Sequence, residues 1–70
     1  MQNNHRKVLL DAIEPMVLAA GQYQPITAQL IEQKAKMVIR IANEDNWFNS
    51  PVSTFVSEAD LILTAQNRFM

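Results

Sequence analysis

The sequence predicts an all-α fold: a small three-helix bundle formed by a single domain over residues 1–70. Apolar residues recur at spacings of three and four through three stretches, which is the pattern of one helix face. Two breaks separate these stretches, at 21–26, which contains Pro25, and at 43–50, which is rich in Asn. Hydrophobic residues make up 49% of the chain and there is one glycine, so the composition is that of packed helices rather than of a disordered chain.

The first helix is predicted over about residues 4–20, with Asn3 or Asn4 as its N-cap. Its apolar face consists of Leu9, Ala12, Ile13, Met16 and Ala20. Pro15 lies inside this pattern, where it removes a backbone donor and disfavours helical geometry in the preceding residue. We therefore expect the helix either to kink at Pro15 or to end there and be followed by a second short helix. Gly21 is the expected terminator, because glycine can adopt the left-handed conformation that closes many helices.

The second helix is predicted over 27–46 with Thr27 as its N-cap, and its apolar surface is wide. An inner stripe at spacings of four, three and four is expected to pack inside the protein, and it consists of Ile31, Ala35, Val38 and Ala42. An apolar flank lies to one side of that stripe and consists of Leu30, Met37 and Ile41. The whole arc covers about 200°, which is about twice what packing against one neighbour requires. We expect this surplus flank to contact a partner.

The remaining face of the second helix carries charges four residues apart, at Glu32, Lys36, Arg40 and Glu44. Pairs of this kind neutralise each other and face water. Lys34 falls inside the apolar arc, and we expect its aliphatic stem to lie on apolar surface while the ammonium group reaches solvent. The main structural alternative is a strand at 37–42, because that run contains several β-branched residues.

The third helix is predicted over 51–69, with Ser50 as its cap and Pro51 at the first helical position. Its expected apolar face consists of Val52, Phe55, Val56, Ala59, Ile62, Leu63, Phe69 and Met70. Leu61 falls off this face, so we assign it to an additional contact, with a partner. A competing start is Ser57, with Asp60 three residues later as an approximate capping box, in which case the residues before it form an extended connector.

The connection at 43–50 holds two aromatic residues, Trp47 and Phe48, whose types anchor many protein interfaces. The two rings are also placed to close the end of the core. The acidic residues of this connection do not form a calcium loop, because that loop requires a central Gly and an oxygen ligand where Trp47 stands. His5 has no carboxylate at helical spacing on its own face, and we expect it to be exposed near the terminus.

Composition argues against several classes of function. The chain has no Cys, which removes disulfides, thiolate zinc sites and cysteine nucleophiles. Paired carboxylates, a Ser–His arrangement and a Gly-rich phosphate loop are all missing, so we expect no enzyme, no catalytic residue, no cofactor and no metal. The formal net charge is −1, from 6 basic and 7 acidic side chains, whereas small nucleic-acid-binding proteins are usually basic. The apolar runs are too short for a membrane span, and we expect a cytoplasmic protein.

These features predict a protein–protein interaction module that self-associates, or docks on a larger protein as a small adaptor or inhibitor. A chain this short gains only about 3–5 kcal/mol from its own core, so assembly is an expected supplement. The predicted partner-binding residues are Leu30, Met37, Ile41, Trp47, Phe48 and Leu61. Size alone favours an accessory protein of the phage or plasmid type. The alternative is a small dimeric DNA-binding regulator, in which Lys36 and Arg40 contact the nucleic acid.

Overall fold

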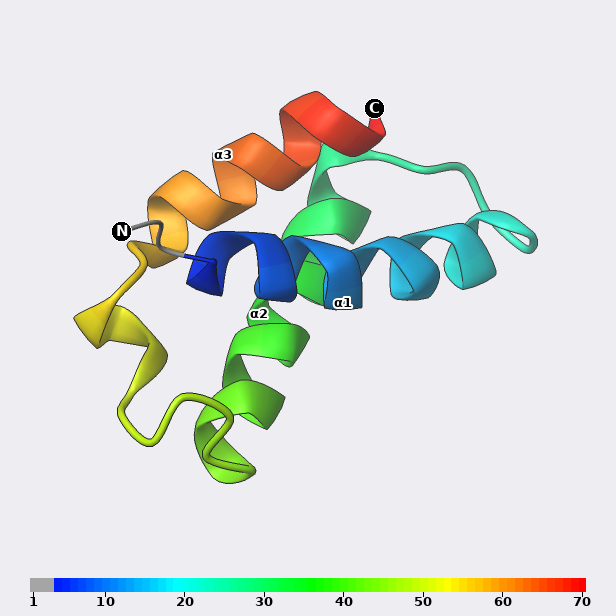
Figure 1. Cartoon of the computed structure of the whole chain (residues 1–70). Helices are drawn as coiled ribbons and strands as arrows, with labels where there is room; N and C mark the ends of the chain where they lie inside the picture. Colours follow the sequence, from blue (N-terminus) through cyan, green and yellow to red (C-terminus); the bar gives the residue numbers. More distant parts are fainter. Residues whose placement is uncertain (1–3) are drawn as a thin grey trace.

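Three helices form the protein, as Figure 1 shows for the computed structural model, which describes residues 4–70. The elements are α1 (His5–Gly21), α2 (Ala28–Glu44), the 3₁₀ turn η1 (Val52–Thr54) and α3 (Glu58–Phe69). The all-α prediction is confirmed, and the run considered as a strand lies in the middle of α2. In the described part of the chain, no helix has the length and apolar character needed to cross a bilayer.

α2 is the central element, because it packs against both other helices and against η1. In Figure 1, α1 lies across α2, and α3 runs from near the start of α1 to near the start of α2. Contacts at both ends hold α3 in this position. The His5 ring stacks on Phe55, just before α3, with the ring centroids 3.9 Å apart. At the other end, Gln66 Nε2 donates to the carbonyl oxygen of Ala28 at 3.0 Å.

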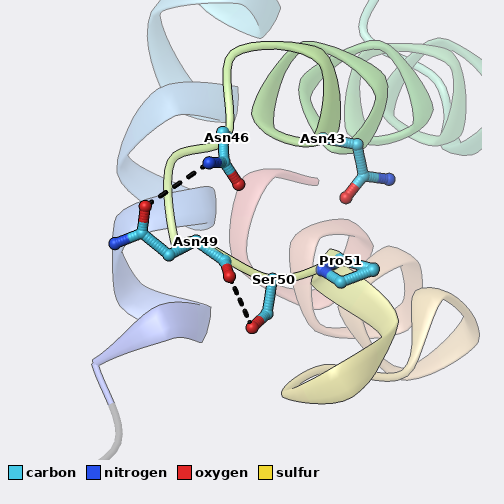
Figure 2. Close-up of a pocket in the computed structure, with 5 residues that line it drawn as sticks. All are labelled: Asn43, Asn46, Asn49, Ser50 and Pro51. Atoms are coloured by element: carbon cyan, nitrogen blue, oxygen red, sulfur yellow. Dashed lines mark hydrogen bonds between the residues drawn. The ribbon is translucent and has the colours of Figure 1, made fainter.

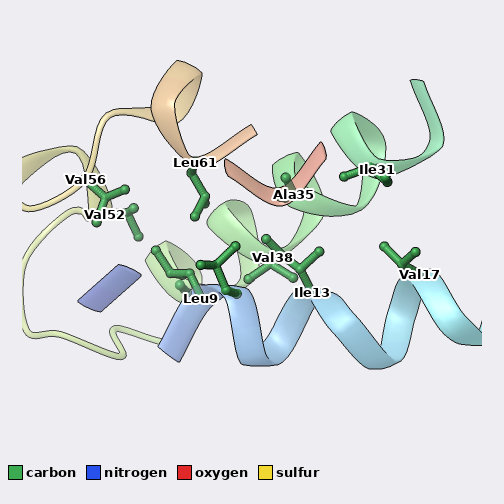
Figure 3. Close-up of a cluster of buried hydrophobic side chains, with 12 residues drawn as sticks. Leu9, Ile13, Val17, Ile31, Ala35, Val38, Val52, Val56 and Leu61 are labelled. Atoms are coloured by element: carbon green, nitrogen blue, oxygen red, sulfur yellow. The ribbon is translucent and has the colours of Figure 1, made fainter. Parts of the chain in front are cut away.

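Apolar side chains from all three helices and from the η1 segment fill the core (Figure 3). The core residues are Leu9, Leu10, Ile13, Val17, Ile31, Ala35, Val38, Ala42, Val52, Val56, Leu61 and Ala65. The inner stripe of α2 is wholly within this set, as the sequence predicts. Every buried side chain among residues 4–70 is apolar, so burial here requires no polar group to leave water.

α1 continues through Pro15, so no second helix begins there. Pro15 and Asp11 are both exposed, so the carbonyl oxygen that loses its usual helical donor belongs to a residue on the surface. Gly21 is the last residue of α1, but it does not have a positive φ. The prediction that it ends the helix in a left-handed conformation is therefore wrong. A Cβ at this position would lie 2.8 Å from Ile26 Cδ1, and the glycine instead provides room for Ile26.

The predicted start of the third helix at Pro51 is wrong, and the competing start at Ser57 is confirmed. Ser57 Oγ accepts a hydrogen bond from the Asp60 N–H at 3.4 Å, which caps α3. Val52 and Val56 enter the core from η1 and the connector rather than from α3. Because the connector breaks the helical phase, these two valines cannot be used to locate the buried face of α3.

Candidate interaction surface

The apolar flank of α2 has one buried end and one half-buried end. Leu30, in the first turn, is 5% exposed, so the prediction that it contacts a partner is wrong. Met37 and Ile41, one turn apart, are half-buried. Neither residue belongs to the buried cluster, and neither is among the half-buried residues packed against that cluster. The half of the flank at Met37 and Ile41 is therefore apolar surface that the internal core does not use.

Leu61 is the predicted partner-binding residue that the structure places in the core. Its side chain is fully buried, at 0% exposure, and Ala65 lies one turn further along the same buried face. A partner cannot reach Leu61 while α3 is packed on α2, so the assignment of Leu61 to a partner surface is wrong. The error arose because the predicted face was extended from residues that precede α3, so its position around the helix axis was incorrect.

A Schellman motif ends α2 and sets the direction of Trp47. The Trp47 N–H donates to the carbonyl oxygen of Ala42 at 3.0 Å, and the Asn46 N–H donates to that of Asn43 at 3.3 Å. Asn46 has a φ of 55°, a left-handed conformation that Asn adopts more easily than most residues. Trp47 follows directly, at the position that often contacts the last helical turn, and its side chain is 39% exposed.

Four rings gather where the connection after α2 folds back over the start of α1. The Phe48 ring meets the Trp47 and Phe55 rings edge-on, with centroids 6.5 Å and 6.1 Å away. His5 stacks on Phe55 and meets Phe48 edge-on, with centroids 4.5 Å apart in the second contact. His5 is half-buried, so the expectation that it would be exposed is wrong. Phe48 and Phe55 pack against the core and close its end, while Trp47 is the exposed member of the group.

The same connection borders an open surface hollow of about 480 Å³, lined by Asn43, Asn46, Asn49, Ser50 and Pro51 (Figure 2). Its amide groups hold the chain reversal together. Asn43 Oδ1 accepts a hydrogen bond from the Val52 N–H at 2.7 Å, which ties η1 to α2. Asn46 Nδ2 donates to Asn49 Oδ1 at 3.4 Å, as the dashed line in Figure 2 shows. The Asn residues of 43–50 therefore position the aromatic group.

The charged face of α2 is only partly neutralised. Lys36 Nζ lies 3.0 Å from Glu32 Oε2, and the hydrogen bond to this carboxylate raises the pKa of Lys36. Among residues 4–70, Arg40 and Glu44 do not form the ion pair that their spacing predicts. Lys34 also lacks an ion pair within this range, and it is half-buried beside the apolar flank.

Exposed apolar side chains also occur away from α2. They are Val8, Leu18, Tyr23, Leu63 and Met70. Leu63 and Met70 were expected in the buried face of the third helix, yet they are 57% and 70% exposed. Residue spacing places Leu63 and Met70 on one side of α3, but it does not show whether that side is covered, so no local signal identifies them as exposed.

Within residues 4–70, His, Cys, Asp and Glu side chains do not come together in groups of three that could hold a metal ion. No protein-family model matches the chain, and no curated protein or solved structure is significantly similar to it. The arrangement of its own surface therefore carries the functional argument.

Proposed function

We propose that this protein is a protein–protein interaction module that binds through the side of α2 bearing Met37 and Ile41, with Trp47 at the edge of the contact. The observation that supports the proposal is that α2 carries two sets of apolar residues, one inside the buried cluster and one outside it. The inner stripe supplies the α2 residues of the buried cluster, with Ile39 packed against that cluster, while Met37 and Ile41 belong to neither group. Because both residues remain half-exposed, a partner can cover them without any change in the core.

The chemistry of these residues supports a protein partner. Burial of apolar surface stabilises a complex by roughly 25 cal/mol per Å². Met and Trp are enriched in protein interfaces, and a rigid, partly exposed Trp is a common anchor. Trp47 is held by the Schellman motif and by its ring contact with Phe48, so little conformational entropy is lost when a partner covers it.

The electrostatics of α2 favour a protein partner over DNA. Lys36 is one of the two cations on the polar face of α2, and its ammonium group is already paired with Glu32. A carboxylate beside a cation weakens attraction to phosphate, which supplies much of the affinity of DNA-binding proteins.

The proposal predicts that Ile41→Asp or Met37→Asp weakens binding at least about tenfold while leaving the fold intact, because each places a charge in the contact but outside the core. Leu63→Asp is the matched control, since Leu63 is an exposed leucine on another helix. Sedimentation equilibrium measures self-association, and an immobilised chain with mass identification of retained proteins measures foreign partners. Circular dichroism reports helicity for every variant.

Two results would contradict this function. The first is an equal loss of helicity and binding in Ile41→Asp, which would place Ile41 in the core. The second is tight binding of nonspecific DNA at low salt that is released steeply as salt rises, which would favour the DNA-binding alternative.

A further inference from the structure

One row of side chains runs the length of the α2 flank at the spacing of paired helices. This flank row advances by steps of four, three, four and three residues, and it consists of Leu30, Lys34, Met37, Ile41 and Glu44. Alternating steps of this kind keep a row on one side of a helix and form the contact line between paired helices. The row lies beside the inner stripe, so a helix packed along it leaves α2 in place on α1 and α3.

The flank row is self-complementary when a second copy lies antiparallel to it. Met37 and Ile41 each lie two residues from Ile39, and Lys34 and Glu44 each lie five residues from it. A twofold axis level with Ile39, whose own side chain packs on the core, therefore places Met37 opposite Ile41 of the second copy. The same axis places Lys34 opposite Glu44 of the second copy. Two apolar pairs then occupy the centre of the contact, with an ion pair at each end.

Both charges are available for these ion pairs. Neither Lys34 nor Glu44 has a side-chain ion pair or hydrogen bond within residues 4–70. Two other lysines are already paired in the chain, Lys7 with Asp11 at 2.8 Å and Lys36 with Glu32 at 3.0 Å. A partner that covers the half-buried Lys34 must supply a carboxylate, because further burial of an unpaired ammonium group is costly. Glu44 of a second copy supplies one at the required level.

The rest of the flank is consistent with this register. In an antiparallel pair, the C-terminal end of one α2 lies beside the N-terminal end of the other, so the opposite partial charges of the helix ends are brought together. The same register brings Trp47 of one copy near the first turn of α2 of the second copy. Arg40 of each copy lies near the axis on the exposed polar side of the row, where solvent screens its charge.

We infer that the protein forms a twofold homodimer through antiparallel α2 helices, joined by Met37–Ile41 contacts and by Lys34–Glu44 ion pairs between the copies. This inference rests on the proposed function of the same side of α2. It adds the identity of the partner, a second copy of this chain, and the register of the contact.

Charge reversal tests the register directly. Sedimentation equilibrium of the full chain, from about 10 μM to about 1 mM, covers the affinities expected of a small interface. Lys34→Glu and Glu44→Lys should each weaken dimerisation about tenfold or more, because each replaces two attractive pairs by two repulsive ones. The double variant K34E/E44K should return to within about threefold of wild type, since the pairs are restored with their signs exchanged. Lys36→Glu, the same charge change on the polar face, is the control and should leave dimerisation unchanged.

The possible failures are distinguishable. A wild-type dimer whose affinity is not recovered in K34E/E44K overturns this register. A wild-type chain that stays monomeric over the whole range overturns the homodimer. A monomeric chain does not by itself contradict the proposed function, because the same surface can bind a foreign protein. The proposed function is also contradicted if Ile41→Asp does not weaken the binding of any foreign protein. Circular dichroism of each variant separates loss of the dimer from loss of the fold.

Discussion

Asn46 holds a left-handed backbone conformation, with a φ of 55°, at the point where α2 ends. Its backbone N–H closes one bond of the Schellman motif, and the next residue, Trp47, closes the other. A residue with a Cβ is strained in this conformation, although Asn tolerates it better than most. The side chain of Asn46 also donates a long hydrogen bond, of 3.4 Å, to Asn49. The left-handed backbone conformation is therefore the main factor that determines which residues are tolerated at position 46.

At this position, Asn46→Gly should keep or slightly raise the free energy of unfolding, because glycine adopts a positive φ without strain. Asn46→Ala should lower it by about 1 kcal/mol, since alanine lacks both the tolerance and the side-chain hydrogen bond. Urea titration followed by circular dichroism measures both changes. If the two variants were equally destabilised, the hydrogen bond to Asn49, rather than the backbone conformation, would be the main contribution.

At the scale of single elements, the α3 segment carries two apolar rows, one through Leu61 and Ala65 and one through Leu63 and Met70, and only the first row is buried. Leu61 and Ala65 are fully buried against the other helices, whereas Leu63 and Met70 face solvent. Helical periodicity shows that both rows exist, but it does not show which of them meets α2. The hydrogen bond from Gln66 to Ala28 and the stacking of His5 on Phe55 hold the two ends of α3 so that the first row faces inward.

This orientation predicts opposite results for two neighbouring leucines. Leu61→Ala should cost about 2–5 kcal/mol, because it leaves a cavity in the core. Leu63→Ala should change the free energy of unfolding by less than about 0.5 kcal/mol, since the residue is exposed. The total stability of so small a protein is only about 3–5 kcal/mol, so Leu61→Ala is expected to unfold much of the population at 25 °C. Thermal denaturation of both variants checks the difference, and equal effects would contradict the assigned face.

At the scale of the molecule, the buried interior of residues 4–70 is apolar and the charged side chains lie outside it. Every buried side chain of residues 4–70 is apolar, and both intramolecular ion pairs lie on exposed helix faces. The hydrogen bond from Lys7 lowers the pKa of Asp11, and the hydrogen bond to Glu32 raises the pKa of Lys36. Both effects occur in solvent, where ion pairs contribute little to stability.

Stability should therefore be nearly constant between about pH 5 and about pH 9. The contribution of Asp11 is present above its ordinary carboxyl range and is lost as the pH falls through its lowered pKa. The contribution of Lys36 is present below the ordinary lysine range and is lost as the pH rises through its raised pKa. Urea midpoints measured across this range test the prediction. A step inside the window would show that another titrating group is coupled to folding.

Local features of the chain were sufficient to predict much of the fold and part of the site. The inner stripe of α2, its cap at Thr27 and the surplus at Met37 and Ile41 all follow from residue spacing within one helix. Thr27 Oγ1 accepts from the Leu30 N–H at 3.1 Å, as its position before the apolar pattern predicts. These are properties of residues within about four positions of each other, so the sequence itself specifies them.

Tertiary contacts decided the remaining features. Leu61 entered the core, His5 became half-buried beneath the connection after α2, and Gly21 proved necessary for the space taken by Ile26. The first two outcomes depend on contacts between residues distant in the sequence, and the third depends on how the chain turns after α1. By itself, the sequence determined which residues share a helix face. Only the packing of the three helices determined which faces are covered, because burial depends on where the other helices lie and not on the period of the helix itself.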